Sequence, residues 1–119
     1  MTQPKIWNLD EVLRENPLED EPVKWVYLVE GQYSTVNVVQ APSMNMPHVH
    51  KEHDETVYAI KGTGTFQLGD KTLPVKPGDV IFIPAGTIHT PITDSYVAAL
   101  SIYSPHFDPK NPDREFTKE

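Results

Sequence analysis

Short runs rich in Val, Ile, Tyr, Phe and Thr recur along the chain, and prolines, glycines and polar residues separate them. Runs of about four to eight such residues between turn residues are typical of β-strands. The pattern predicts strands near residues 23–30, 33–41, 47–51, 55–61, 64–69, 71–76, 80–84, 88–92 and 97–104. No helical pattern alternates with them, so the sequence favours an all-β sandwich or barrel.

Turn residues and one helical pattern complete this prediction. Leu9 to Arg14 is the only helical candidate, and Asn16-Pro17 ends it. Gly69-Asp70 separates two strand patterns, and glycine at the first turn position suits a type II′ hairpin. Residues 105–119 carry three prolines and few apolar residues, so we expect an extended, partly mobile C-terminal tail in preference to a packed arm.

Composition limits the chemistry that the chain can support. With 119 residues it has the size of one domain, which we place at residues 1–119. The 17 acidic and 10 basic residues leave a net charge of −7, which disfavours nucleic-acid binding. Cysteine is absent, so only His, Asp and Glu remain as strong metal ligands. With neither a secretory signal nor a membrane-length apolar run, we expect a cytoplasmic protein without a membrane partner.

The histidines are concentrated in two short segments, which hold four of the five. His48 and His50 are two residues apart on a predicted strand, so both side chains can face the interior. Glu55 follows after a short loop and can face the same interior if the chain reverses there. His89 lies after a Pro-Ala-Gly turn in the second segment. These four side chains would converge if the two segments lay side by side.

The spacing of these residues resembles the two sequence motifs of the cupin superfamily. The first motif reads G-x5-H-x-H-x(3,4)-E-x6-G, and residues 42–62 follow it except at the opening glycine, which is Pro42 here. The second motif reads G-x5-P-x-G-x2-H-x3-N, and residues 78–93 follow it except at the closing asparagine, which is Thr93 here. Neither departure falls on a ligand position of the family. The resemblance implies a single-domain cupin jelly-roll barrel, preceded by a short helical or extended segment.

The resemblance also implies a divalent transition metal ion held by His48, His50, Glu55 and His89. Three imidazoles and one carboxylate suit Mn, Fe, Co, Ni, Cu or Zn, and the sequence does not choose among them. Four protein ligands on an octahedral ion leave two positions for water or substrate, which suits chemistry or ligand capture. The alternative is a barrel without metal, whose histidines are buried polar residues.

Other polar residues near the motifs carry weaker predictions. His53 is either an alternative ligand or acid–base group at the rim of the site, or an ordinary exposed turn histidine. Glu52 and Asp54 are expected to be solvated loop residues, because only Glu55 has the motif's distance to the following glycine. His106 is expected at the surface.

The walls of the pocket and its substrate class can be outlined. Residues in phase with the ligands are Met44, Met46, Val57, Ala59 and Lys61. They are expected either to line a pocket or to be plain core.

Arg14 and Arg114 both lie near the termini, so no predicted strand offers an arginine for phosphate recognition. This disfavours a phosphosugar isomerase. A compact molecule that chelates the metal through two oxygens fits better, such as a hydroxy acid, keto acid, uronate-like sugar, diketone or catechol-like compound.

Three functional hypotheses follow for such a site. The first is an enzyme that uses the metal as a Lewis acid in isomerase or lyase chemistry. The second is a non-haem dioxygenase, and the third is a non-catalytic protein that binds a small ligand. No helix-turn-helix accompanies the barrel, so a DNA-binding regulator is excluded. The resemblance also suggests a homodimer built through sheet edges and the segment Trp7 to Leu13.

Overall fold

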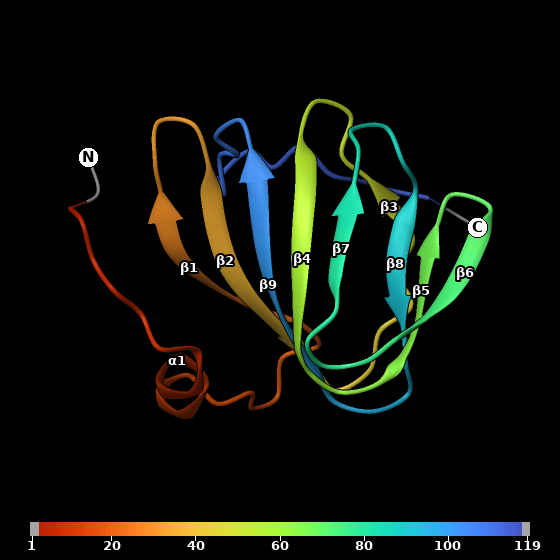
Figure 1. The fold of residues 1–119 in the computed structure, drawn as a ribbon, viewed down its shortest axis with the longest axis horizontal. Coiled ribbons are helices and arrows are strands. Elements are labelled where there is room, and N and C mark those ends of the chain that lie inside the picture. The colour runs from red at the N-terminus through yellow and green to blue at the C-terminus, as the bar shows by residue number, and fades with distance from the viewer. Residues whose placement is uncertain (1–2, 118–119) are drawn as a thin grey trace.

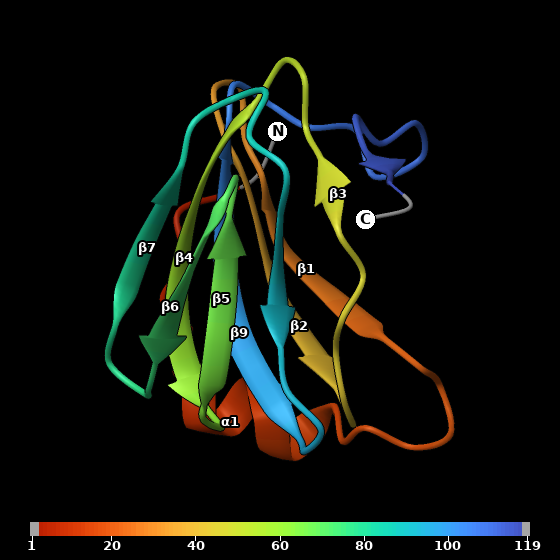
Figure 2. The same ribbon diagram turned by 90° about the vertical axis from the view of Figure 1, so that its right-hand side faces the viewer.

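Two antiparallel sheets of five strands each face one another in the computed structural model, which describes residues 3–117 (Figures 1 and 2). In spatial order, the first sheet contains β1 (Lys24–Glu30), β2 (Thr35–Ala41), β9 (Val97–Ser104), β4 (Asp54–Lys61) and β7 (Val80–Ile83). The second contains β10 (Glu115–Phe116), β3 (His48–Val49), β8 (His89–Ile92), β5 (Gly64–Leu68) and β6 (Lys71–Val75). This crossing of consecutive strands between two sheets is a jelly roll, which confirms the predicted fold class.

All nine strands predicted from the sequence form, and their ends differ from the predicted ones by at most two residues. The helix α1 (Leu9–Glu15) also lies where the helical pattern predicted it. At the β5–β6 turn, Gly69 has a φ of 63°, whereas no residue other than glycine has a positive φ in the described chain. A positive φ at the first turn position alone matches the predicted type II′ hairpin.

Side chains alternate across each strand and so separate an outer from an inner layer. On the outer face of the first sheet, α1 packs Val12 and Leu13 against Val38 and Ala98. Inside the barrel, buried apolar side chains from both sheets meet: Val57 of β4, Phe66 of β5 and Ile83 of β7. Each such side chain contributes about 1.5–3 kcal/mol by its removal from water. No helix in residues 3–117 is long and apolar enough to span a membrane.

Gly62, which closes the first motif, must be a glycine in this fold. Its φ of 94° lies in the left-handed region, which side chains disfavour. A Cβ atom there would also collide with the backbone carbonyl oxygen of Tyr96. Because backbone cannot move aside as a flexible side chain can, only glycine lets β4 turn into β5 beside the start of β9.

The C-terminal segment packs on the barrel, so the prediction of a partly mobile tail is wrong for residues 105–117. Phe107 is fully buried, and its ring stacks on Tyr103 at 4.3 Å between ring centres. The Thr35 hydroxyl donates to the Phe107 carbonyl oxygen at 2.9 Å and accepts from its N–H at 2.8 Å. The low apolar content of the tail was misleading because one buried aromatic ring anchors it.

Asp113 makes the second anchor of this C-terminal arm. Its carboxylate accepts hydrogen bonds from the backbone N–H groups of Lys51 and Glu52, at 3.0 and 2.7 Å. The same carboxylate lies 2.7 Å from Nδ1 of His53. Shortly after Asp113, β10 pairs with β3, which begins at His48. The arm therefore closes over the loop between the first two predicted ligands and Glu55.

Replacing Asp113 by alanine is expected to lower the free energy of unfolding by about 1–3 kcal/mol, because two backbone donors lose their acceptor. Burial raises the pKa of Asp113, but hydrogen bonds from His53 and two backbone N–H groups lower it overall. A lowered pKa in the folded state means that this stability is present above the ordinary value of 3.8 and is lost as the pH falls below it. Urea denaturation at several pH values measures both effects.

The matched control is Asp94→Ala, which removes an exposed carboxylate that makes no hydrogen bond within residues 3–117. Equal stability of the two variants would contradict the anchoring role of Asp113.

Candidate metal centre

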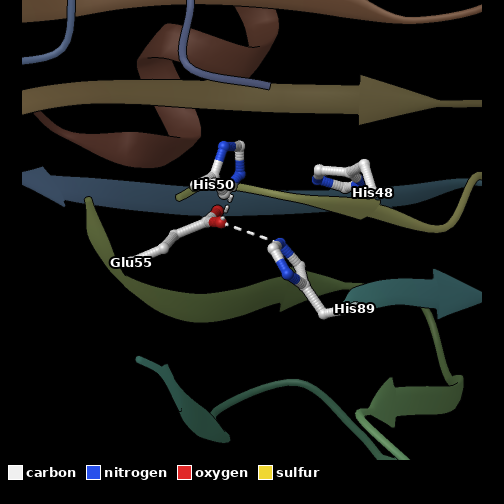
Figure 3. A group of neighbouring side chains, drawn as sticks. All are labelled: His48, His50, Glu55 and His89. Carbon is white, nitrogen blue, oxygen red and sulfur yellow. Dashed lines mark hydrogen bonds and ion pairs between the residues drawn. The ribbon is translucent and has the colours of Figure 1, made fainter. Parts of the chain in front are cut away.

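The four predicted ligands meet inside the barrel. His48 lies on β3, His50 directly follows it, Glu55 lies on β4 and His89 opens β8. One potential ligand atom from each lies within 4.8 Å of the others. His50 and His89 are each 2% exposed and Glu55 is 5% exposed. The carboxylate of Glu55 points between the rings of His50 and His89, with His48 beside them (Figure 3).

Backbone contacts between the two motif segments bring these side chains together. β3 pairs with β8, with His48 opposite His89 in the register. The backbone N–H of Gly86 donates to the carbonyl oxygen of His50 at 2.8 Å. Gly86 has a φ of 87°, so the turn of the second motif depends on this glycine. The loop closed by the C-terminal arm then returns the chain so that Glu55 faces the same interior.

Each of the three imidazoles is oriented by a backbone carbonyl group. Nδ1 of His48 lies 2.8 Å from the Met46 oxygen, and Nδ1 of His89 lies 2.9 Å from the Thr87 oxygen. Nδ1 of His50 lies 2.6 Å from the Asp113 oxygen. A carbonyl oxygen only accepts, so Nδ1 carries the proton in all three rings. When an imidazole is neutral, its Nε2 therefore presents a lone pair, as a metal ligand requires.

This arrangement leaves a site that needs a positive charge. Nε2 of His50 and of His89 lie 3.2 and 3.1 Å from the same oxygen of Glu55. With Nδ1 protonated, a neutral imidazole there turns a lone pair toward a carboxylate, and Nε2 of His50 is buried with no hydrogen-bond partner. A proton or a metal ion among these atoms removes the conflict. The donor set therefore fits a divalent transition metal.

The ionisation of Glu55 agrees with that fit. Burial raises the pKa of Glu55, but the neighbouring imidazoles of His50 and His89, when they are protonated, lower it well below its ordinary value. The carboxyl group is thus held as the anion that a cation needs as its partner. Beside it, burial raises the pKa of the Tyr103 phenol, and the charge of Glu55 adds to that shift. Tyr103 therefore stays a neutral hydroxyl.

A cavity of about 110 Å³ opens beside this cluster, and His48, Glu55 and His89 line it. The five residues predicted from the strand phase all lie in its wall: Met44, Met46, Val57, Ala59 and Lys61. An apolar wall excludes bulk water and strengthens electrostatic interactions at the ligands.

Arg114 and Tyr103 also line the cavity, and the sequence analysis missed both. The predicted strands contain no arginine, but the packed C-terminal arm brings Arg114 to the cavity wall. Tyr103 lies opposite Glu55 in the pairing of β4 with β9. Residues that lie far from the motifs in the chain have no local signature, but the aromatic residues of the tail were a signal that it packs.

The remaining polar residues near the motifs lie outside the cluster. His53 places Nδ1 against Asp113 and Nε2 2.9 Å from the carbonyl oxygen of His106, so both ring nitrogens are engaged elsewhere. An acid–base role for His53 stays a prediction. His106 is exposed, as expected. Asp54 is exposed as well, but its carboxylate accepts a hydrogen bond from the N–H of Ala85, which ties the two motif segments together.

The chain matches one family model, and it is similar to known proteins in sequence and in fold. Residues 35–103 match the family model of the Cupin domain. An uncharacterized protein of Aquifex aeolicus is 31% identical over 108 residues, which cover 90% of this chain and 89% of that protein. Quercetin 2,3-dioxygenase of Bacillus subtilis is 35% identical over 49 residues, which are 41% of this chain and 14% of that enzyme.

A solved structure shares the fold over nearly the whole of the matched chains. It is a conserved protein with a double-stranded β-helix domain from Klebsiella pneumoniae, with a TM-score of 0.78 and 20% sequence identity. The match covers 98% of this chain and 100% of that one.

The lowered pKa of His48 predicts how the stability of the metal-free protein depends on pH. Burial, the largest influence, and the charge of His89 lower this pKa from 6.5 to about 4. Because the folded-state pKa is the lower one, the unfolded chain binds more protons between these values. The stability that neutral His48 gives the folded state is therefore fully present above pH 6.5. About 1–3 kcal/mol of the free energy of unfolding is lost as the pH falls toward 4.

Denaturation of chelator-treated protein over this pH range measures that loss, and NMR of the His48 ring gives its pKa directly. His48→Gln is the control, since it removes the titrating group and should flatten the pH dependence. A ring that titrates near 6.5 would contradict the burial argument.

Proposed function

Because the chain belongs to the cupin superfamily, we propose that it is a metalloprotein that holds one divalent transition metal ion through His48, His50, Glu55 and His89. The observation that carries this proposal is the convergence of three carbonyl-oriented imidazoles on one buried carboxylate. Two Nε2 atoms share one Glu55 oxygen, and one of them has no hydrogen-bond partner. A resident cation satisfies all of these groups at once.

We further propose that the protein is an enzyme acting on a small, oxygen-rich molecule that chelates the metal. A bound divalent ion supplies Lewis-acid chemistry, which polarises a carbonyl oxygen and stabilises the enediolate of isomerase and lyase reactions. The chain contributes the rest. Met44, Met46 and Val57 wall the cavity and keep water out, while the neutral hydroxyl of Tyr103 can donate a hydrogen bond to a substrate oxygen.

Two other functions share the same site. A non-haem dioxygenase is favoured by the 49-residue similarity to quercetin 2,3-dioxygenase, which covers 14% of that enzyme. A non-catalytic protein that binds a small ligand is favoured by the engagement of both His53 nitrogens, which leaves no obvious general base beside the cluster.

The homodimer and the cytoplasmic location also belong to the proposal. Val12 and Leu13 of the expected pairing segment pack on their own chain. Of the two parts of the expected dimer contact, we therefore propose that the sheet edges bind the second copy.

Replacing His89 by alanine is expected to lower metal affinity by about tenfold to a hundredfold or more, because one of four ligands is lost. The β fold should persist, since the apolar cluster inside the barrel does not include His89. Metal content by elemental analysis and affinity by calorimetry measure the effect, and circular dichroism checks the fold.

The control is His106→Ala, which removes an exposed histidine bonded to Thr35. It should leave metal binding unchanged. Full metal affinity in His89→Ala, or its loss in His106→Ala, would show that the ligand assignment is wrong.

The type of reaction is tested by incubating metal-loaded protein with small oxo and hydroxy acids in D₂O without oxygen. Lewis-acid chemistry predicts exchange of the proton beside the carbonyl group, seen as loss of its NMR signal, and this exchange should vanish in Glu55→Gln. Oxygen uptake by the iron-loaded protein without such exchange would favour the dioxygenase. Binding of the acids with neither reaction would favour the non-catalytic protein.

A further inference from the structure

A cationic side chain shares the cavity with the four-residue cluster. Arg114 lines the same cavity as His48, Glu55 and His89, although it comes from the C-terminal arm. Its position is set by both neighbours in the chain. The Asp113 carboxylate holds the loop after β3, and Glu115 pairs with Val49 in the strand register. The backbone at Arg114 is therefore fixed beside the cavity as long as the arm stays packed.

The Arg114 guanidinium lies over two aromatic rings. Its central carbon lies 5.0 Å from the ring centre of Trp25 and 5.6 Å from that of Phe107. Such contacts stabilise the cation without an acceptor oxygen, so its N–H groups can still form hydrogen bonds. Tyr103 also lines the cavity, and Arg114 is near enough to it to lower the pKa of its hydroxyl against the effect of burial.

Arg114 has no anionic partner within residues 3–117. The acidic residues on either side are engaged elsewhere: Asp113 with His53 at 2.7 Å and Glu115 with Lys51 at 3.0 Å. Arg114 is half-buried in the wall of a mainly apolar cavity, whereas Lys61, the other basic residue of that wall, is exposed. A partly desolvated cation is costly unless an anion compensates it.

The cavity also contains polar groups suited to a ligand with several oxygens. Ser101 lies in its wall. Asn37 pairs with Ser101 in the strand register and lies on the same face of β2 as Val39, another wall residue. The Asn37 side chain is fully buried, and neither its amide nitrogen nor its oxygen has a hydrogen-bond partner. The Asn37 amide thus has a donor and an acceptor without partners, beside the cavity on the side of β2 and β9.

We propose that Arg114 binds a carboxylate of the ligand, which is a small oxo or hydroxy acid carrying a second carboxylate beyond its chelating end. The planar fork of arginine matches a carboxylate through two parallel hydrogen bonds, which lysine cannot reproduce. This inference rests on the proposed metal function, since the chelating end of the ligand binds the ion. Arg114 selects the ligand through the carboxylate that lies away from the metal.

The test compares two probes with the same chelating end, 2-oxoglutarate and 2-oxopentanoate, which differ in the distal carboxylate. Binding to Ni²⁺-loaded protein is measured by calorimetry. The wild-type protein should bind 2-oxoglutarate more tightly by about tenfold to a hundredfold, the range expected for hydrogen bonds to a charged group. Arg114→Gln should abolish this preference and leave 2-oxopentanoate binding unchanged. Arg114→Lys should retain only part of it.

The matched control is Arg14→Gln, which removes the other arginine of the chain from the exposed surface of α1. It should keep the full preference for 2-oxoglutarate. If Arg114 only held the arm in place, Arg114→Gln would lower the affinity for both probes equally, and this result would overturn the proposal. Absence of any preference in the wild-type protein would overturn it as well.

A Ni²⁺ titration of each protein separates this inference from the proposed metal function. If the wild-type protein binds no nickel, the metal function fails, and the same two probes are compared on the metal-free protein. A preference for 2-oxoglutarate that depends on Arg114 would then support the carboxylate site alone. The lack of such a preference would overturn the carboxylate site too.

Discussion

The structure depends on one buried carboxylate that two imidazoles share. Glu55 carries negative charge inside the barrel, and both His50 and His89 direct Nε2 at the same oxygen. Their Nδ1 protons are already committed to backbone carbonyl groups, so these rings can satisfy Glu55 only with an added positive charge. A buried anion without such compensation would destabilise the barrel. The barrel thus encloses four side chains that could hold a cation.

The C-terminal arm belongs to this centre as much as the two motifs do. The carbonyl oxygen of Asp113 orients His50, while the Asp113 carboxylate holds the loop that leads to Glu55. Phe107 anchors the arm in the interior, and Arg114 reaches the cavity from it. Ligand orientation, loop closure and the character of the cavity wall are therefore coupled through one short segment.

Local patterns made most of the fold predictable. Strand alternation and turn residues are properties of neighbouring positions, so β4 and β9 and the Gly69 turn follow from sequence. The convergence of the four side chains was predictable because their spacing in the two motifs is distinctive. The packing of the arm was not predictable, because its anchors join residues that are distant in the chain. The Thr35 hydroxyl donates to the carbonyl oxygen of Phe107, which is 72 positions away. The same separation hid Arg114, whose place in the cavity wall depends on how the arm packs.

The central claim is that three imidazoles and one carboxylate of this chain hold a single metal ion. X-ray absorption spectroscopy of the protein loaded with one equivalent of Ni²⁺ tests it most directly, because imidazole rings give a distinct multiple-scattering pattern. The account predicts three imidazole ligands, with oxygen donors in the remaining positions. One imidazole or none, or sulfur scattering from Met44 or Met46 in the cavity wall, would contradict it.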